Sequence, residues 1–156
     1  MSGPAVVHGR KTDETIVKWR HQIVEFLNDV FDTSHQVIDQ AIDRRHGNAA
    51  YWVLITSEQR ILALCTIGLD EENKLGFVYN FSVHKYQRRR HLGTMLVHNI
   101  KSIFPNYDFY GLVDHENQDA IQFYNKMGAK RSDLLVNIDG TMYEEYRFDS
   151  QLSLVK

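Results

Sequence analysis

Three adjacent arginines mark the segment of the sequence that is best suited to bind an anion. This segment consists of Arg88, Arg89, Arg90, His91, Leu92, Gly93 and Thr94. Residues 77–83 are rich in aromatic and β-branched side chains and predict a strand, whereas apolar spacings of three and four over 92–104 predict a helix. The first helical turn has unpartnered backbone N–H groups and a partial positive charge, so phosphate can bind there. The pattern therefore predicts a phosphate site between strand and helix, the alternative being a solvated turn.

A second segment, residues 117–129, has polar side chains at a spacing that suits a long ligand. Asn117 and Tyr124 are seven residues apart, which is close to two helical turns, so they share one face of a helix. Ala120 lies between them and leaves room for a chain-like molecule along that face. Taken singly, Asn117 is equally well explained as a helix N-cap and Tyr124 as a core tyrosine.

Together, the two segments resemble the signatures of the GNAT superfamily of N-acetyltransferases. Arg88, His91 and Gly93 are spaced similarly to the pyrophosphate-binding pattern Gln/Arg-x-x-Gly-x-Gly/Ala, with His91 in place of the usual glycine. Residues 117–129 match every named position of the pattern Asn-x-x-Ala-x-x-Phe-Tyr-x-Lys-x-Gly-Phe/Ala. If the backbone at His91 needs a positive φ, histidine is a tolerated but costlier occupant than glycine.

The resemblance implies that acetyl-CoA is the cosubstrate and that a primary amine attacks its thioester directly, through a tetrahedral intermediate. The residues implied to contact acetyl-CoA are Phe81, Ser82 and Val83 through their backbone, the seven residues from Arg88 to Thr94, Asn117 and Tyr124. Tyr124 occupies the general-acid position. Its phenol, with an ordinary pKa of about 10, is protonated at neutral pH and can donate to the departing thiolate.

The group that takes the proton from the amine is left open by the sequence. A lysine-like amine has a pKa near 10.4, so only about one molecule in a few thousand is neutral at pH 7. Histone-type members of the superfamily place a glutamate early on the strand, but the matching position here is Phe77, which cannot serve. The candidates are His84, Tyr79 and a chain of water molecules. His84 has the right pKa range, and an exposed loop histidine without a catalytic role is the simpler explanation of it.

Carboxylates are frequent in the two regions that flank the acceptor entrance in this superfamily. The acids are Asp29, Asp32, Asp39, Asp43, Asp139, Glu144 and Glu145, and Tyr143 and Tyr146 are expected to line the groove. A carboxylate-rich mouth attracts cations, which favours a cationic small molecule such as a polyamine as the acceptor. The alternative is that these acids are ordinary surface residues.

Other functions stay open. A protein lysine or N-terminal acetyltransferase would share the chemistry and differ in the shape of its groove. A non-catalytic GNAT domain that binds CoA, or no cofactor, is a hypothesis from another class, and its support is His91 in place of glycine. A nucleic-acid binder based on the three arginines is disfavoured by the net charge of −2.

Length and composition predict one domain over residues 1–156, with 43% hydrophobic residues to form its core, and the resemblance implies that this is a single GNAT-type acetyltransferase domain. The one cysteine, Cys65, lies in an apolar run and is expected in that core, so no internal disulfide can form and a cytoplasmic location fits. No apolar run reaches the roughly 18 residues of a membrane span, and the N-terminus lacks a signal-peptide pattern. We expect no membrane partner, no nucleic acid and no metal, and the sequence is compatible with a homodimer.

The periodicity predicts a definite order of elements. A short strand is expected at Val6 and Val7, and helices are expected at 13–30, between the breaks at 32–34 and 46–48, at 92–104 and at 117–127. Strands are expected at 51–56, 60–69, 108–113, 129–137 and 142–148, and in a run that ends at Val83. This order resembles the GNAT fold. It predicts a mixed α/β class with a largely antiparallel central sheet of six to seven strands, flanked by about four helices.

Overall fold

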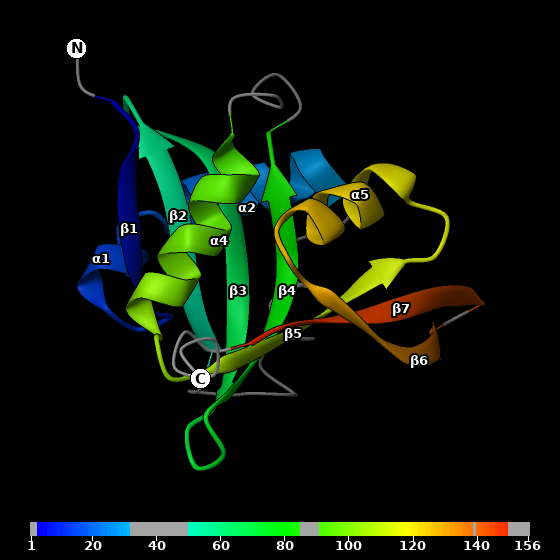
Figure 1. Cartoon of the computed structure of the whole chain (residues 1–156). Helices are drawn as coiled ribbons and strands as arrows, with labels where there is room; N and C mark the ends of the chain where they lie inside the picture. The colour runs from blue at the N-terminus through cyan, green and yellow to red at the C-terminus, as the bar shows by residue number, and fades with distance from the viewer. Residues whose placement is uncertain (1–2, 32–49, 85–90, 139, 150–156) are drawn as a thin grey trace.

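The computed structural model describes residues 3–31, 50–84, 91–138 and 140–149, and it is built around one seven-stranded sheet (Figure 1). The strands are β1 (Ala5–Arg10), β2 (Ala50–Ser57), β3 (Arg60–Asp70), β4 (Leu75–Val83), β5 (Asp108–Asp114), β6 (Lys130–Ile138) and β7 (Thr141–Phe148). The described helices are α1 (Glu14–Val17), α2 (Arg20–Phe31), α4 (Leu92–Ile103) and α5 (Gln118–Lys126).

The strand order in the sheet is β1-β2-β3-β4-β5-β7-β6, and one pair of neighbours, β4 and β5, is parallel. All other neighbouring strands run antiparallel. A parallel pair requires a crossover connection, and α4 supplies it between β4 and β5. The predicted fold class, a mixed α/β fold with a largely antiparallel sheet, is therefore confirmed.

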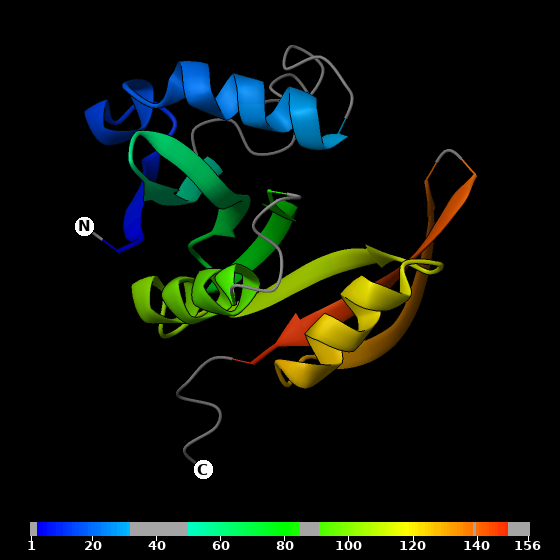
Figure 2. The same ribbon diagram turned by 90° about the horizontal axis from the view of Figure 1, so that it is seen from above.

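The helices cover both faces of the sheet. Seen from above, α1 and α2 lie on one face, and α4 and α5 lie on the other (Figure 2). β2 shows why the sheet can be covered twice: Trp52 and Leu54 are buried in the cluster under α1 and α2, whereas Val53 and Ile55 are buried in the cluster under α4 and α5. Because successive side chains of a strand point to opposite faces, this nearly continuous apolar run fills two cores.

The first helical region differs from its prediction, because it forms two helices instead of one. Around Trp19 the ladder tightens: its N–H donates to the carbonyl of Ile16, three residues back, before Ile23 resumes the spacing of four. The turn allows Ile16, Trp19 and Ile23 all to reach the same buried cluster. The continuous helix predicted over 13–30 was therefore wrong. The second predicted helix, between 32–34 and 46–48, lies outside the described residues.

The other predicted strands and helices are present, with ends that differ by a few residues. The short strand at Val6 and Val7 extends over Ala5–Arg10. Cys65 is fully buried in β3, as expected. No described helix has the length and apolar character that crossing a membrane requires.

β6 forms one edge of the sheet and is interrupted near its start. Its register against β7 shifts between Arg131 and Leu135, and Asp133 has a φ of +65° within that interval. The strand is exposed along most of its length, including Leu134 and Leu135.

We expect Gly76→Ala to destabilise the fold at the β4–β5 pair. A Cβ at this position would lie 2.5 Å from ring atoms of Phe109, its partner in the parallel register, so backbone or ring must shift. Urea denaturation should show a loss of about 1–3 kcal/mol in the free energy of unfolding. Gly3→Ala, where a Cβ meets nothing within 4 Å, is the matched control. Equal stability of the two variants would contradict the packing at this pair.

Candidate active site

β4 and β5 separate halfway along their length, and this separation creates the opening in the sheet (Figure 1). Their pairing consists of four residue pairs and ends at Val78 and Gly111. Beyond that point β4 has a bulge, in which Asn80 and Phe81 together face Cys65 of β3. Asn80 has a φ of +55°, as the extra residue of a bulge often does. The bulge turns β4 away from β5 and leaves its far half without a strand partner on that side.

Tyr124 of α5 lies at the point where the two strands part. Gly111 belongs to the last β4–β5 pair, and a Cβ built on it would lie 3.8 Å from the hydroxyl oxygen of Tyr124. Its ring contacts the rings of Phe81, Tyr146 and Phe148, at centroid distances of 6.0, 5.7 and 5.6 Å. An apolar pocket lies beside it, lined also by Gly111, Phe81 and residues of α4.

The environment of Tyr124 holds its phenol in the protonated form. Burial raises the pKa of Tyr124 above its ordinary value, and the nearby Cys65 raises it further. The structure gives the Tyr124 hydroxyl no hydrogen bond to another described residue, so its proton is available to a ligand. Burial also raises the pKa of the Cys65 thiol, which makes Cys65 a core residue and not a nucleophile.

The predicted cofactor-contact residues of β4 border the opening. Phe81 packs its ring on Phe123 and Tyr124. The Ser82 hydroxyl is buried and donates to the carbonyl of Asn80, while Val83 pairs with β3. At the bulge, the side-chain nitrogen Nδ2 of Asn80 is buried without a hydrogen-bond partner. A buried donor without a partner is costly, and such a group at a strand opening suits a polar ligand such as the amide-containing arm of CoA.

His91 begins α4 in a left-handed conformation, with φ +59° and ψ +24°. The positive φ accounts for the glycine that the GNAT pattern usually has here, because glycine adopts this conformation without strain. In this chain the exposed His91 adopts that conformation, and its side chain makes no capping hydrogen bond to the helix.

Leu92, Gly93 and Thr94 form the first turn of α4. Leu92 is buried in the core and Thr94 is half-buried. A Cβ on Gly93 would lie 3.0 Å from the Phe123 ring, so the glycine allows α4 and α5 to pack closely. The three arginines, Arg88 to Arg90, lie outside the described residues.

Asn117 is the N-cap of α5, and its side-chain oxygen accepts a hydrogen bond from the N–H of Ala120 at 3.1 Å. The capping explanation of Asn117 is thereby confirmed. The side chain is exposed. Its Nδ2 group is a donor that the cap does not use, so a ligand contact is compatible with capping.

The candidate bases have different surroundings. Phe77 stacks on Tyr110 with ring centroids 6.1 Å apart, which leaves no proton acceptor at that position. His84 follows β4, and its Nε2 lies 3.7 Å from a carboxylate oxygen of Asp29 on α2. Its side chain is 29% exposed, so His84 is partly enclosed and not a free loop histidine. Tyr79 is half-buried on β4.

Some of the acidic and aromatic side chains predicted at the acceptor entrance are buried in the structure. Glu144 is 5% exposed and Tyr146 is 2% exposed, both on the face of β7 that packs toward Tyr124, so neither lines an open groove. Glu145 points to the opposite face and accepts a hydrogen bond from Ser132 at 2.8 Å. Tyr143 is half-buried. Asp32, Asp39, Asp43 and Asp139 lie outside the described residues.

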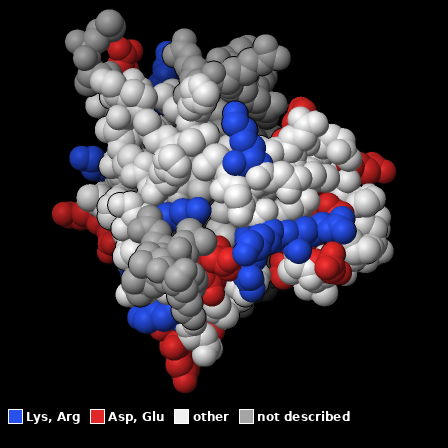
Figure 3. Space-filling model, viewed as in Figure 1, with Lys and Arg blue, Asp and Glu red and all other residues white. Residues whose placement is uncertain are grey.

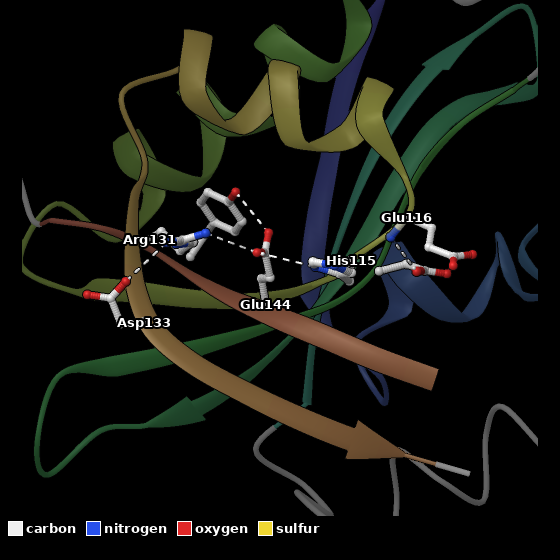
Figure 4. A network of polar contacts seen from close by, with 7 residues as sticks. His115, Glu116, Arg131, Asp133 and Glu144 are labelled. Carbon is white, nitrogen blue, oxygen red and sulfur yellow. Dashed lines mark hydrogen bonds and ion pairs between the residues drawn. The ribbon is translucent and has the colours of Figure 1, made fainter. Parts of the chain in front are cut away.

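Sequence reasoning missed a polar network centred on Glu144 (Figure 4). Arg131 donates to Oε1 of Glu144 at 3.1 Å, and Nδ1 of His115 lies 3.4 Å from the same oxygen. The Tyr146 hydroxyl donates to Oε2 in a long hydrogen bond of 3.4 Å. The alternation in β7 could have placed Glu144 on the buried face with Tyr146 and Phe148. Its partners come from other elements and have no local signal.

The charged residues near this network neutralise one another. Figure 3 shows a band of basic side chains over the β6–β7 hairpin with acidic side chains beside it. Lys130 and Arg147 both pair with Asp149, and Arg131 pairs with Asp133 as well as Glu144. Within the described ranges, no group of three or more His, Cys, Asp or Glu is arranged to hold a metal ion.

The strain at His91 predicts how substitutions there affect stability. His91→Val should lower the free energy of unfolding by about 1–2 kcal/mol, because a β-branched residue is disfavoured at positive φ. His91→Gly should change it by less than about 1 kcal/mol, since relief of strain is offset by the greater entropy of the unfolded chain. Thermal and urea denaturation measure both. Because residue 91 is exposed, a change in packing would not explain a change in stability. A valine variant as stable as the parent protein would argue against the left-handed conformation.

Comparisons with known proteins agree with this geometry. The family model described as "Acetyltransferase (GNAT) family" matches residues 17–129. No curated protein sequence matches the chain. Solved structures with a similar fold include the following three proteins, each less than 25% identical to this chain, so their likeness shows the fold alone.

A chimera of the spermidine N-acetyltransferase SpeG from Vibrio cholerae and hSSAT has a TM-score of 0.69 and 13% identity, covering 99% of each chain. An aminoglycoside 6'-N-acetyltransferase complexed with coenzyme A has a TM-score of 0.71 and 11% identity, covering 92% of this chain and 96% of its own. A GNAT family acetyltransferase from Elizabethkingia anophelis with acetyl-CoA bound has a TM-score of 0.66 and 12% identity, covering 92% and 97%.

The family model covers more than two thirds of the sequence, and its match includes both β4 and the whole of α5. The separated strands, the left-handed start of α4 and the phenol at the strand opening occur in one described structure. The chain belongs to the acetyltransferase (GNAT) family and is an acetyltransferase that uses acetyl-CoA.

Proposed function

We propose that this protein transfers the acetyl group of acetyl-CoA to a primary amine of a cationic small molecule, with a polyamine as the representative acceptor. We further propose that residues 1–156 form one acetyltransferase domain. The observation that carries the proposal is the Tyr124 hydroxyl at the last β4–β5 pair, protonated and without a hydrogen bond to another described residue. A proton donor at the point where the strands part is suited to a thioester held between them.

The binding of acetyl-CoA would use the elements around the opening. The first turn of α4, from His91 to Thr94, offers backbone N–H groups to the pyrophosphate, with Arg88 to Arg90 adding positive charge. The unpaired edge of β4 from Phe81 to Val83 offers hydrogen bonds to the amide-containing pantetheine arm. Asn117 retains a donor for the same arm.

Tyr124 would act on the leaving group. A CoA-like thiol has a pKa near 8.5, below that of the phenol, so full transfer of the proton from Tyr124 to the thiolate is uphill. The first contribution of the phenol is therefore a hydrogen bond to the developing negative charge on sulfur, in a largely apolar environment. The proton lost by the attacking amine can finally neutralise the phenol or the thiolate.

We propose that the amine loses its proton to a group on the face of the sheet that α2 covers. His84 is the described imidazole candidate, and we propose that Asp29, 3.7 Å from its Nε2, orients it. Tyr79 and a water chain through the strand opening remain the other routes. Phe77 cannot contribute, because its phenyl side chain has no group that can accept a proton; its ring stacks on Tyr110.

Charge supports a cationic acceptor. Asp29 keeps its side chain 52% exposed on α2, and Glu145 faces away from the buried side of β7. Exposed carboxylates raise the local concentration of cations in a salt-dependent way. The similarity of fold to a spermidine N-acetyltransferase is consistent with such an acceptor. A protein lysine or α-amine, and a CoA-binding domain without catalysis, are the outcomes against which the proposal is tested.

A panel of amines decides among these functions. Thiol release from acetyl-CoA is measured with spermidine, an aminoglycoside, a lysine peptide, a peptide with a free α-amine and a neutral-chain amine as control. We expect the highest kcat/KM for spermidine, with a KM that rises as salt is added. Highest activity on a peptide would reject the small-molecule assignment. Thermal stabilisation by acetyl-CoA without thiol release from any amine would favour the non-catalytic domain.

Tyr124→Phe should reduce kcat by about 10²–10⁴-fold while leaving the Kd for acetyl-CoA nearly unchanged, because only the hydroxyl is lost. Tyr107→Phe is the matched control, since this half-buried tyrosine packs on Phe104 and Phe109 away from the opening. In the parent protein, the phenol must be protonated to act, and its pKa is raised above the ordinary value of about 10. The rate should therefore show no decline between pH 7 and about pH 9. Full activity of Tyr124→Phe would remove the general-acid role.

A further inference from the structure

Glu144 is a buried carboxylate that contacts three elements of the C-terminal half of the molecule (Figure 4). It lies on β7 and accepts a hydrogen bond from Arg131 of β6. His115, in the turn between β5 and α5, lies 3.4 Å from the same carboxylate oxygen. A charge in a buried position is expensive unless it is paired and hydrogen-bonded, so this arrangement requires the three elements to keep their relative positions.

The network reaches α5 at two places. His115 is two residues before Asn117, the N-cap, so its contact with Glu144 lies where the helix begins. The Tyr146 hydroxyl donates to the other oxygen of Glu144, and the Tyr146 ring stacks on Tyr124 with an interplanar angle of 22°. One carboxylate thus fixes the ring on which the phenol of Tyr124 rests.

From this geometry we infer that Glu144 is a positioning residue for Tyr124: through Tyr146 and His115 it sets where the phenol lies at the strand opening. The inference rests on the proposed role of Tyr124. Glu144 pairs with Val113, two residue pairs along β7 from the pair that Tyr146 forms with Gly111, and it acts through its neighbours. It is not proposed to touch substrate.

Glu144 can be substituted without leaving a buried charge unpaired. Arg131 and His115 have side chains 54% and 58% exposed, so both can be solvated when the negative charge is removed. Glu144→Gln keeps the size and one acceptor oxygen. Tyr146→Phe keeps the stacked ring and removes only the hydroxyl that reaches Glu144. Glu145→Gln is the matched control, because it changes the adjacent glutamate on the opposite face.

The position of Tyr124 is observed directly by NMR of protein labelled with ¹³Cζ-tyrosine, in which the Tyr124 resonance is assigned by its loss in Tyr124→Phe. We expect this resonance to shift or split in Glu144→Gln and in Tyr146→Phe, and to stay in place in Glu145→Gln. An unchanged Tyr124 resonance in both Glu144→Gln and Tyr146→Phe would overturn the inference. This measurement needs neither acetyl-CoA nor an acceptor.

A double-mutant cycle separates positioning from general damage to the fold. With saturating acetyl-CoA and spermidine, Glu144→Gln should lower kcat by about tenfold, since small displacements of a catalytic group are costly, and leave the KM for acetyl-CoA within about threefold. In a Tyr124→Phe background, the same substitution should have little further effect, because the hydroxyl it positions is gone. Equal loss in both backgrounds would assign Glu144 a merely structural role.

The two proposals fail in different ways. If Tyr124→Phe retains full kcat, the general-acid role fails, whatever the substitutions at Glu144 do. If Tyr124→Phe is impaired while Glu144→Gln is fully active with an unmoved Tyr124 resonance, only the positioning role fails.

Discussion

The structure depends on the short parallel pairing between β4 and β5. Four residue pairs join the β1–β4 half of the sheet to the half formed by β5, β7 and β6. The two halves share one core, because the buried cluster under α4 and α5 contains residues of β2 and β3 together with residues of β5, β7 and α5. A second cluster lies under α1 and α2 and belongs to the β1–β4 half. In the other half, the polar network at Glu144 adds contacts between β6, β7 and the turn before α5. The same short pairing leaves the strand opening on which the proposed chemistry relies.

Aromatic packing connects the opening to the second half. Phe81 from β4, Phe123 and Tyr124 from α5, and Tyr146 and Phe148 from β7 contact one another as a chain of rings. Such contacts contribute about 0.5–1.5 kcal/mol each beyond burial. Because these rings pack between the two halves of the sheet, they can hold the Tyr124 phenol in a fixed position at the opening. Desolvation by these rings is also the main cause of the raised pKa of Tyr124.

Much of this architecture could be predicted from local periodicity, and the parts that could not share a physical reason. The alternation and length of β2 and β3, and the apolar stripe at Ile16, Trp19 and Ile23, follow from burial that each segment needs by itself. The break between α1 and α2, the bulge at Asn80 and the burial of Glu144 depend on partners distant in the chain. A single sequence has no signal for such partners. For the candidate site, motif spacing placed Tyr124 and Asn117 on one helix, whereas the contacts of Tyr124 with β4 and β7 depend on strand pairing that the sequence does not show.

The contact between Gly93 and the ring of Phe123 changes what the motif glycine can be taken to mean. A side chain there would push apart two helices that both border the opening. The requirement is steric and internal to the fold, so it does not depend on nucleotide binding. Selection for a well-packed helix pair would keep this glycine even in a descendant that no longer binds acetyl-CoA. Under the role proposed for Tyr124, its phenol is a more discriminating marker of activity than the glycine of the better-known signature.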